Sequence, residues 1–266
     1  MEEYQLTSKQ LEIINGALLG DGSLIMHKNG TNANFSYLSK SIEHVHFVCD
    51  DLADFVMPSH NFYISKYLDK RTNKEYERCD FRTKANPAFT KIYYEWYNNK
   101  IKIIPKNLIL TPLICLIWYL GDGSLLTHAR SQYIHLCTDN FKKDDIENIL
   151  LPQLEQFESH LIEQKTNQYR IYIPRRKIKD FLNYIGECPV KDYLHKWNFQ
   201  EYRYEPLSNY PERIEKIIIA YKNGSSPKTI ADYFDIDRTT VLRCLEKHGI
   251  DSNLNRFSRK KVCFNE

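Results

Sequence analysis

Two stretches of the chain repeat one pattern of apolar and polar positions. Residues 11–24 and 113–125 each consist of an apolar run that passes directly into Gly-Asp-Gly-Ser-Leu. Apolar runs of this length and continuity are typical of helices that are buried on all sides. The pattern therefore predicts two core helices, each ending beside an acidic residue, Asp21 in the first and Asp122 in the second.

Residues with known capping preferences flank both predicted helices. Thr7, three residues before Gln10, can form a capping box, and Thr111 precedes a proline at the first helical position. At the other ends, Gly22 and Gly123 are expected to be the left-handed residues that close each helix.

The same order of elements follows each apolar run, namely two strands, a helix, two strands and a helix. In the first half the predicted ranges are 23–26, 34–39, 41–56, 62–68, 75–83 and a helix from 86 onward. In the second half they are 125–128, 133–137, 143–157, 161–164, 169–173 and 175–185. Internal duplication is the simplest account. We predict an α+β fold with two pseudo-symmetric αββαββα repeats over residues 1–106 and 107–205.

The pattern changes beyond residue 205. Residues 213–222, 226–234 and 238–248 each carry an apolar stripe at helical spacing, and short polar turns separate them. We therefore predict a third, all-α domain over residues 206–266 that ends in a basic tail.

The position of the two acids points to a metal. A carboxylate at a helix C-terminus lies among unpaired carbonyls, where the helix dipole disfavours it by about 0.3–1 kcal/mol. A divalent cation such as Mg²⁺ reverses this, because carboxylates and carbonyls are hard oxygen ligands. Small residues near the helix ends would let the two helices approach and bring both acids together; they are Gly16, Ala17, Gly20 and Gly121. An exposed Asp-Gly turn after an ordinary core helix is the alternative.

The repeated segments resemble the signature helices of LAGLIDADG homing endonucleases, in the monomeric form with two motifs in one chain. Residues 14–22 and 115–123 align with the nine-letter motif and put Asp21 and Asp122 at its acidic position, although Ile117 stands where a small glycine is usual. The resemblance implies a staggered cut of both DNA strands across the minor groove. It also implies two or three Mg²⁺ ions at the shared helix ends, held by the two acids and the carbonyls of Gly20 and Gly121.

Two further segments resemble those that carry the active-site lysine of this family. Lys102 lies in a Lys-x-Ile-Pro-like stretch before the second apolar run, and Lys196 lies in a Tyr-x-x-Lys stretch after the second repeat. A surface lysine is the alternative for each.

In the family each repeat presents a curved four-stranded sheet to the DNA major groove, where Arg, Lys, Asn and Gln side chains can read base edges. The candidates in the first half are Lys28, Asn32, Asn34, Lys66, Lys70, Arg71, Arg78 and Arg82. Those in the second half are Arg130, Gln132, Lys165, Gln168 and Arg170. Strand alternation decides which face of the sheet each side chain occupies.

The third domain resembles the helix-turn-helix domain of resolvases and invertases over roughly forty residues, through the segment Ile-Ala-x-x-Phe-x-Ile-x-x-Thr-Thr-Val-x-Arg. By that likeness its last helix is the recognition helix, with Arg238, Thr239, Thr240 and Arg243 facing the major groove. A small protein-binding module is the alternative.

Composition narrows the class of protein. The chain has 266 residues, 42% of them apolar, and it contains neither an apolar stretch of membrane-spanning length nor a secretory signal. Its seven cysteines are scattered, which favours reduced thiols in a cytoplasmic (nucleoid) compartment or an organellar matrix. Net charge is only +3, but residues 66–106 hold eleven basic against five acidic side chains. That local excess is compatible with a DNA-binding face or with an ordinary solvated one.

We expect a monomeric, Mg²⁺-dependent DNA endonuclease whose partner is double-stranded DNA. Two non-cleaving alternatives on the same fold stay open: a DNA-binding transcription regulator and an intron-RNA maturase. The two motif acids argue against the regulator, whereas maturase activity can coexist with them and would add intron RNA as a partner.

Overall fold

The structure is a computed structural model. It describes residues 5–27, 30–56, 62–70, 72–128, 131–200, 207–253, 255 and 262. The chain forms two compact units, one of Met1–Thr127 with Ser131–Phe199 and the other of His128–Arg130 with Gln200–Glu266. Each unit has its own hydrophobic core. Among the six cysteines described, none forms a disulfide, which agrees with the expected reduced thiols.

The first unit contains both predicted repeats. The first repeat consists of α1 (Ser8–Leu19), β1 (Ser23–Met26), β2 (Ala33–Ser39), α2 (Ile42–Cys49), η1 (Asp50–Phe55), β3 (Tyr63–Asp69), β4 (Lys74–Arg82) and α3 (Pro87–Trp96). A short β5 (Tyr97–Asn98) and β6 (Ile101–Lys102) follow. The second consists of α4 (Pro112–Asp122), β7 (Gly123–His128), β8 (Ser131–Cys137), α5 (Lys143–Asp145), η3 (Ile146–Leu150), η4 (Leu151–Phe157), β9 (His160–Lys165), β10 (Gln168–Ile173), η5 (Arg175–Lys177) and α6 (Ile178–Ile185), and η6 (Lys191–Trp197) ends the unit.

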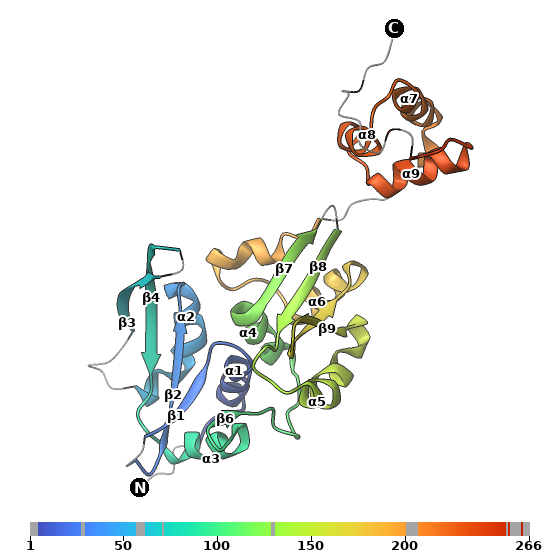
Figure 1. Cartoon of the computed structure of the whole chain (residues 1–266). Coiled ribbons are helices and arrows are strands. Elements are labelled where there is room, and N and C mark those ends of the chain that lie inside the picture. Colours follow the sequence, from blue (N-terminus) through green and yellow to red (C-terminus); the bar gives the residue numbers. More distant parts are fainter. Residues whose placement is uncertain are drawn as a thin grey trace. The chain divides into compact units, whose positions relative to one another are not determined.

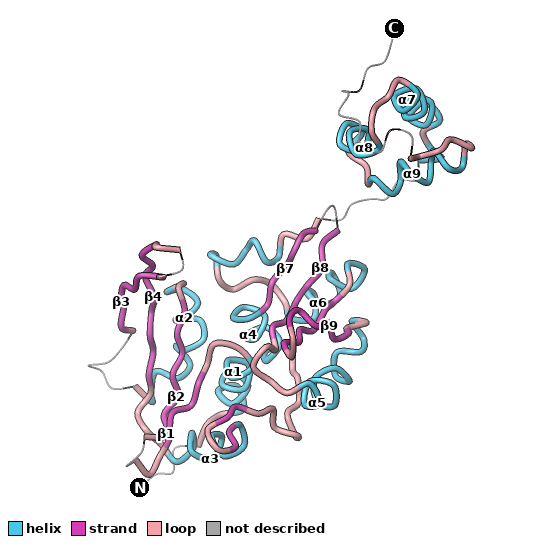
Figure 2. The backbone as a smooth tube through the Cα atoms, in the orientation of Figure 1, coloured by secondary structure: helices cyan, strands magenta, loops and turns pink. Residues whose placement is uncertain are grey.

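The two repeats build equivalent sheets. One has the strand order β1-β2-β4-β3 and the other β7-β8-β10-β9. The pairs β1–β2, β2–β4, β3–β4, β8–β10 and β9–β10 are antiparallel. Helices α1 and α4 pack against each other between the two sheets (Figures 1 and 2). The predicted α+β class and the repeated order of elements are confirmed.

Two predicted helices are less regular than their periodicity suggests. The range 41–56 divides into α2 and the 3-10 helix η1, and the range 143–157 contains only one turn of α-helix before a π turn and a 3-10 segment. In the second case Pro152 lies in the first turn of η4 and lacks the backbone N–H that a continuous α-helix requires there. The hairpin β5–β6 was not predicted; Asn99 and Lys100 form its turn with positive φ.

The prediction that Gly22 and Gly123 adopt left-handed conformations is wrong. Among the described glycines only Gly186, Gly224 and Gly249 have positive φ. Close approach explains the motif glycines instead: a Cβ added at Gly22 would lie 2.8 Å from the carbonyl oxygen of Ala17. A Cβ at Gly123 would lie 2.0 Å from the Tyr119 ring. The chain turns back so tightly after each signature helix that no side chain fits.

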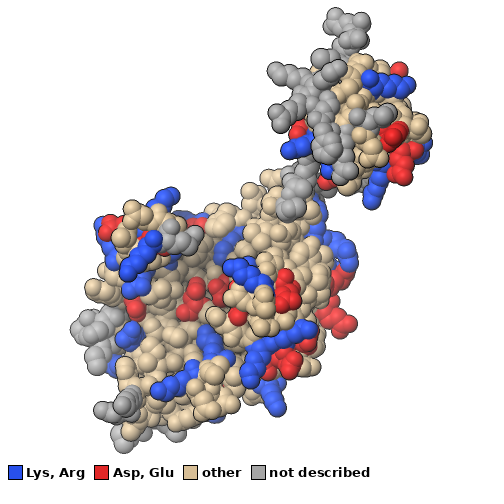
Figure 3. Space-filling model, in the orientation of Figure 1, with Lys and Arg blue, Asp and Glu red and all other residues tan. Residues whose placement is uncertain are grey.

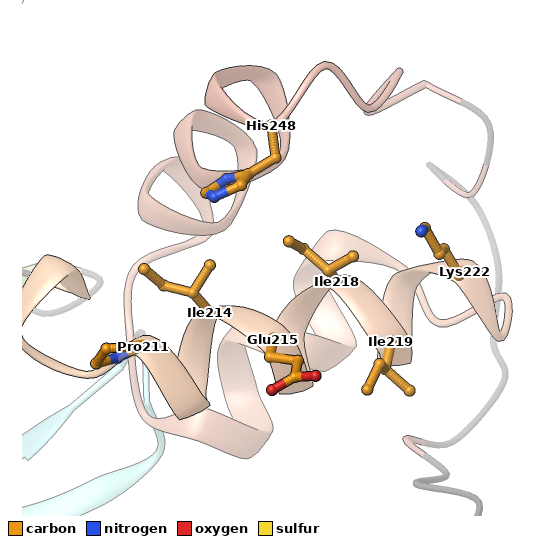
Figure 4. Close-up of a pocket in the computed structure, with 7 residues that line it drawn as sticks. All are labelled: Pro211, Ile214, Glu215, Ile218, Ile219, Lys222 and His248. Carbon is orange, nitrogen blue, oxygen red and sulfur yellow. The ribbon is translucent and has the colours of Figure 1, made fainter.

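The second unit contains η7 (Leu207–Asn209) and three helices, α7 (Pro211–Lys222), α8 (Pro227–Phe234) and α9 (Arg238–Lys247). Their buried faces meet in a small core. Ser226 caps α8, Asp237 caps α9, and Asp235 turns the chain between them in the left-handed conformation. An open pocket of about 470 Å³ lies beside α7 and His248, lined mainly by the partly exposed side of α7 (Figure 4).

Candidate active site

The signature helices approach closely because one of them lacks a side chain at the contact. A Cβ added at Gly16 of α1 would lie 2.7 Å from the Cβ of Ile117 and 2.8 Å from the carbonyl oxygen of Ile114, both in α4. The predicted role of small residues is therefore confirmed for Gly16. Ile117, the residue that departs from the family pattern, is the side chain that fills the space.

This packing brings the two acids to one place. A Cβ at Gly20 would lie 3.6 Å from the Cβ and Cγ of Asp122, and a Cβ at Gly121 would lie 3.5 Å from Oδ2 of Asp21. Each carboxylate thus lies against the glycine of the opposite helix. The caps that begin the helices, the Thr7–Gln10 capping box and the Thr111 hydroxyl, are present as predicted.

Burial makes both acids weaker than usual, and the charge of Asp21 adds to this effect at Asp122. The pKa of Asp122 is raised to about 6, mainly by burial and next by the negative charge of Asp21, against the opposing effect of Lys102 and Lys196. Burial also raises the pKa of Asp21, although its side chain borders solvent and both lysines lower the pKa. A cation bound between the two carboxylates would favour the ionised form of both.

Lys102 and Lys196 each lie at the end of one signature helix. The Lys102 ammonium donates to the carbonyl oxygens of Leu18 and Gly22 at 2.8 Å each. The Lys196 ammonium donates to those of Leu120 at 2.6 Å and Tyr119 at 3.2 Å. Burial lowers the pKa of both lysines to about 8, while Asp122 and Asp21 raise it. Both side chains therefore remain largely protonated at neutral pH, within the field of both acids.

The donor set suits a hard divalent cation. No cluster of three or more His, Cys, Asp or Glu side chains that could hold a metal occurs in the described part of the chain. Mg²⁺ does not require one, since it keeps several waters and is usually bound through one or two carboxylates together with substrate phosphates. Asp21, Asp122 and nearby backbone carbonyls fit that pattern. The raised pKa of Asp122 means that the protein's own charges do not fully stabilise the ionised carboxylate, and a bound cation would stabilise it.

Strand register decides which candidate DNA contacts share a face. In the first sheet Arg82 is paired with Ser36 and Arg78 with Ser65, so both arginines lie on the face opposite Phe81 and Cys79 of the core. Asn34 shares that face; it is buried, and its Oδ1 has no hydrogen-bond partner among the described residues. Lysines and arginines lie over both halves of the visible face of this unit, with acidic side chains between them (Figure 3).

Other candidates lie elsewhere or already have partners. Lys66 pairs with Glu77, on the opposite face of the sheet from Arg78. The Asn32 side chain accepts a hydrogen bond from the Thr90 hydroxyl. Gln132 is buried and donates a hydrogen bond to the backbone carbonyl of Asn198. Lys70 is exposed at the turn after β3, and Lys165 and Gln168 pair where β9 meets β10. Lys28, Arg71 and Arg130 lie outside the described residues.

Arg170 lies on the face of the second sheet opposite Ile171, and both of its donors reach Asp139 at 2.8 and 3.1 Å. In the second unit Arg238 and Arg243 are exposed on α9 and Thr240 is half-buried. The Thr239 hydroxyl donates to Asp237, so it contributes to capping α9. The role of these residues in DNA binding stays a prediction.

Sequence reasoning missed a buried polar group beside the acids. Tyr37 of β2 and His44 of α2 are joined by a hydrogen bond of 3.1 Å, and the Tyr37 hydroxyl lies 3.6 Å from the Cβ position of Gly121. The only signal in the sequence was His44, one helical turn before Val48 on a predicted helix, and a histidine in such a place is more often a satisfied core residue.

Part of the first unit matches a known family of proteins. The model of the "LAGLIDADG DNA endonuclease family" matches residues 11–181. DNA endonuclease I-ChuI of Chlamydomonas applanata is 30% identical over 205 residues, which cover 66% of this chain and 92% of that protein. Cytochrome b mRNA maturase bI2 of Debaryomyces hansenii is 23% identical over 203 residues, covering 71% of this chain and 76% of the maturase.

Among solved structures, the homing endonuclease I-WcaI bound to its DNA recognition sequence superposes with a TM-score of 0.64 at 20% identity, covering 74% of this chain and 88% of that one. At that identity the likeness concerns the fold. None of the described helices has the length and apolar character needed to cross a bilayer.

Proposed function

Because the chain belongs to the LAGLIDADG DNA endonuclease family, we propose that it is a site-specific homing endonuclease acting as a monomer. It makes a staggered double-strand break in a long DNA target by metal-dependent phosphodiester hydrolysis. The observation that carries the proposal is the packing of Asp21 and Asp122, each against the glycine at the end of the other signature helix.

Asp21 and Asp122, with the carbonyl oxygens of Gly20 and Gly121, would hold Mg²⁺. When bound, the ion supplies Lewis-acid stabilisation of the phosphodiester and a water of lowered pKa. With a pKa of about 6, Asp122 is mostly ionised at neutral pH and can act as a ligand. Lys102 and Lys196, which are protonated there, offset negative charge that grows on the phosphate during hydrolysis.

The test does not require the target sequence to be known. The full-length protein is incubated with a plasmid library carrying a randomised insert, in Mg²⁺ or in EDTA, and the broken ends are sequenced. We expect staggered ends within one selected sequence in Mg²⁺ and none in EDTA. Specific binding without a break in Mg²⁺ would instead identify a DNA reader that does not cut.

The second unit is proposed to be a helix-turn-helix domain that extends the target, with α9 as its recognition helix. Exposed Arg238 and Arg243 on α9 support this. Repeating the selection with residues 207–266 removed separates the roles: a shorter selected site assigns base reading to this domain, and an unchanged site argues against it.

Maturase activity is a second candidate because the relative from Debaryomyces hansenii is named as an mRNA maturase. It does not compete with cleavage, since one chain can carry both. Binding and splicing of the intron that encodes the reading frame, measured with purified protein in vitro, would establish it. Absence of any effect on splicing would leave the endonuclease alone.

A further inference from the structure

The Tyr37 cluster, defined as Tyr37, Ser39, His44 and Tyr193, is a buried polar group on one side of the acid pair. Tyr37 is 1% exposed and His44 is fully buried, and their side chains bond at 3.1 Å. The other imidazole nitrogen of His44 contacts the Ser39 hydroxyl at 3.4 Å, and Ser39 bonds to the Tyr193 hydroxyl at 3.1 Å. A buried hydrogen-bonded network of this kind holds its members in fixed orientations.

The Tyr37 hydroxyl borders the proposed metal site. The Cβ position of Gly121 is 3.6 Å from this hydroxyl and 3.5 Å from Oδ2 of Asp21, so both oxygens border the same space. Burial raises the pKa of Tyr37 well above its ordinary value, and the charges of Asp21 and Asp122 raise it further. Burial lowers the pKa of His44 to about 3, with Lys196 acting in the same direction. A neutral phenol thus meets a neutral imidazole.

The cluster also contacts the segment that carries Lys196. The Lys196 ammonium lies 4.6 Å from the centre of the Tyr193 ring, and that ring meets the His44 ring edge-on at 4.9 Å. Next to it, the Ser41 hydroxyl donates to Asp192 at 2.6 Å. The first repeat therefore fixes the position of the lysine that follows the second repeat.

Among the described residues, the core face of β8 carries no tyrosine–histidine pair to match Tyr37 and His44. Its core-facing positions are Gln132, Ile134 and Leu136, and Gln132 donates to the Asn198 carbonyl. Tyr97, the strand partner of Lys102, accepts the backbone N–H of Leu24. Lys102 itself is held by backbone carbonyls.

We propose that Tyr37, oriented by His44, is a positioning residue for the solvent beside Asp21 at one of the two cleavage positions, and that the two DNA strands are consequently cut at unequal rates. This inference rests on the proposed endonuclease function. In this arrangement His44 donates its Nε2–H to the phenol oxygen and accepts at Nδ1 from Ser39, so the Tyr37 O–H is left to point toward solvent. Tyr37 keeps its proton throughout and forms no covalent bond with DNA.

The test compares Tyr37→Phe with the matched control Tyr184→Phe. The Tyr184 hydroxyl donates to Leu110, before the start of α4 and at the other end of that helix from Asp122. A plasmid carrying the selected target, labelled differently on each strand, gives both single-turnover nicking rates in Mg²⁺. Affinity for the same DNA in EDTA and the thermal midpoint are measured in parallel.

We expect Tyr37→Phe to slow the nicking of one strand about tenfold, which is the effect of one hydrogen bond of ordinary strength. The nicking rate of the other strand should stay within about twofold of wild type, and DNA affinity in EDTA should be unchanged. Tyr184→Phe should leave the ratio of the two rates unaltered. Equal slowing of both strands by Tyr37→Phe, or no slowing, would overturn the inference.

Two further measurements separate this inference from the proposed function and from misfolding. In metal-free protein, Tyr37→Phe should shift the imidazole ¹⁵N resonance of His44, whereas Tyr184→Phe should not; an unmoved resonance would also overturn the inference. His44→Gln, which keeps a polar side chain, should reproduce the strand bias more weakly, and equal rates in it would count against His44 as the orienting group. If the wild-type protein cuts neither strand, it is the endonuclease proposal that fails.

Discussion

The two signature helices carry the same closing motif but contribute differently to their contact. Helix α1 ends at Leu19 and leaves Asp21 in the following turn, whereas α4 continues to Asp122. At the crossing α1 supplies the bare Gly16 and α4 supplies Ile117. One missing side chain is therefore enough for close approach, and the pair tolerates a large residue on the other helix as long as its partner position is empty.

The two lysines show the opposite relationship, because they come from dissimilar segments and make equivalent contacts. Lys102 lies in the short strand β6 and Lys196 in the 3-10 helix η6, yet each donates to carbonyls at the C-terminus of the signature helix of its own repeat. A cation there complements the helix dipole. Both repeats thus place a lysine ammonium group at the end of the signature helix, although the segments that carry the two lysines differ in structure.

Replacing either acid should have the largest effect. Asp21→Asn or Asp122→Asn keeps the shape of the side chain and removes its charge, so each should lower cleavage at least about 10³-fold, in line with loss of a metal ligand. DNA affinity in EDTA should be unchanged. The exposed Asp54→Asn in η1 serves as the control. Full cleavage by both acid variants would refute the proposed site.

The lysines should come next. Lys102→Met or Lys196→Met keeps the aliphatic stem and removes a charge that offsets the phosphate, which should slow cleavage about 100-fold. If the two halves serve separate strands, the variants should slow opposite strands, as nicking of a doubly labelled target would measure. Lys91→Met, an exposed lysine of α3, is the control. Wild-type rates in both lysine variants would contradict equivalent roles.

The helix contact should respond to a single methyl group. Gly16→Ala places a Cβ 2.7 Å from that of Ile117, and overpacking of this kind should lower the free energy of unfolding by about 2 kcal/mol. Gly20→Ala is the control, because its Cβ would make ordinary contacts at 3.6 Å. Urea unfolding measures both. Adding Ile117→Ala to Gly16→Ala should recover part of the loss, and strict additivity would argue against a direct contact.

The smallest effect concerns the metal-free protein. Asp122 has a pKa of about 6 in the folded state against 3.8 in the unfolded one, so its contribution to stability is present below pH 3.8 and is lost as the pH rises through about 6. Asp122→Asn should therefore match the wild type near pH 4 and be more stable at pH 7. We expect a difference of about 1 kcal/mol, which is less than the full shift corresponds to because solvent screens the partly exposed carboxylate. Unfolding midpoints in EDTA across this range measure it. A less stable variant at pH 7 would reverse the sign and contradict the raised pKa.

Local sequence was enough to predict most helices and strands and to select Asp21 and Asp122 as candidate site residues. Helix periodicity, caps and a repeated motif are all properties of neighbouring residues. It failed where a close approach decides the residue and where distant segments meet. The motif glycines were assigned to a backbone conformation, whereas the actual constraint on Gly123 is its close approach to Tyr119, one helical turn earlier. Lys66 and Arg78 looked equivalent until strand register put them on opposite faces. The sequence did not predict that Tyr37 and His44 pair beside Gly121, because that position depends on the crossing of α1 and α4.

The central claim is that Asp21 and Asp122 share one site at that crossing, and the carboxyl ¹³C titration of Asp122 in metal-free protein tests it most directly. We expect an apparent pKa of about 6 that falls in Asp21→Asn, because the charge of Asp21, one of the causes of the raised pKa, is removed. A value near that of a free aspartate, unchanged when Asp21 is replaced, would contradict it.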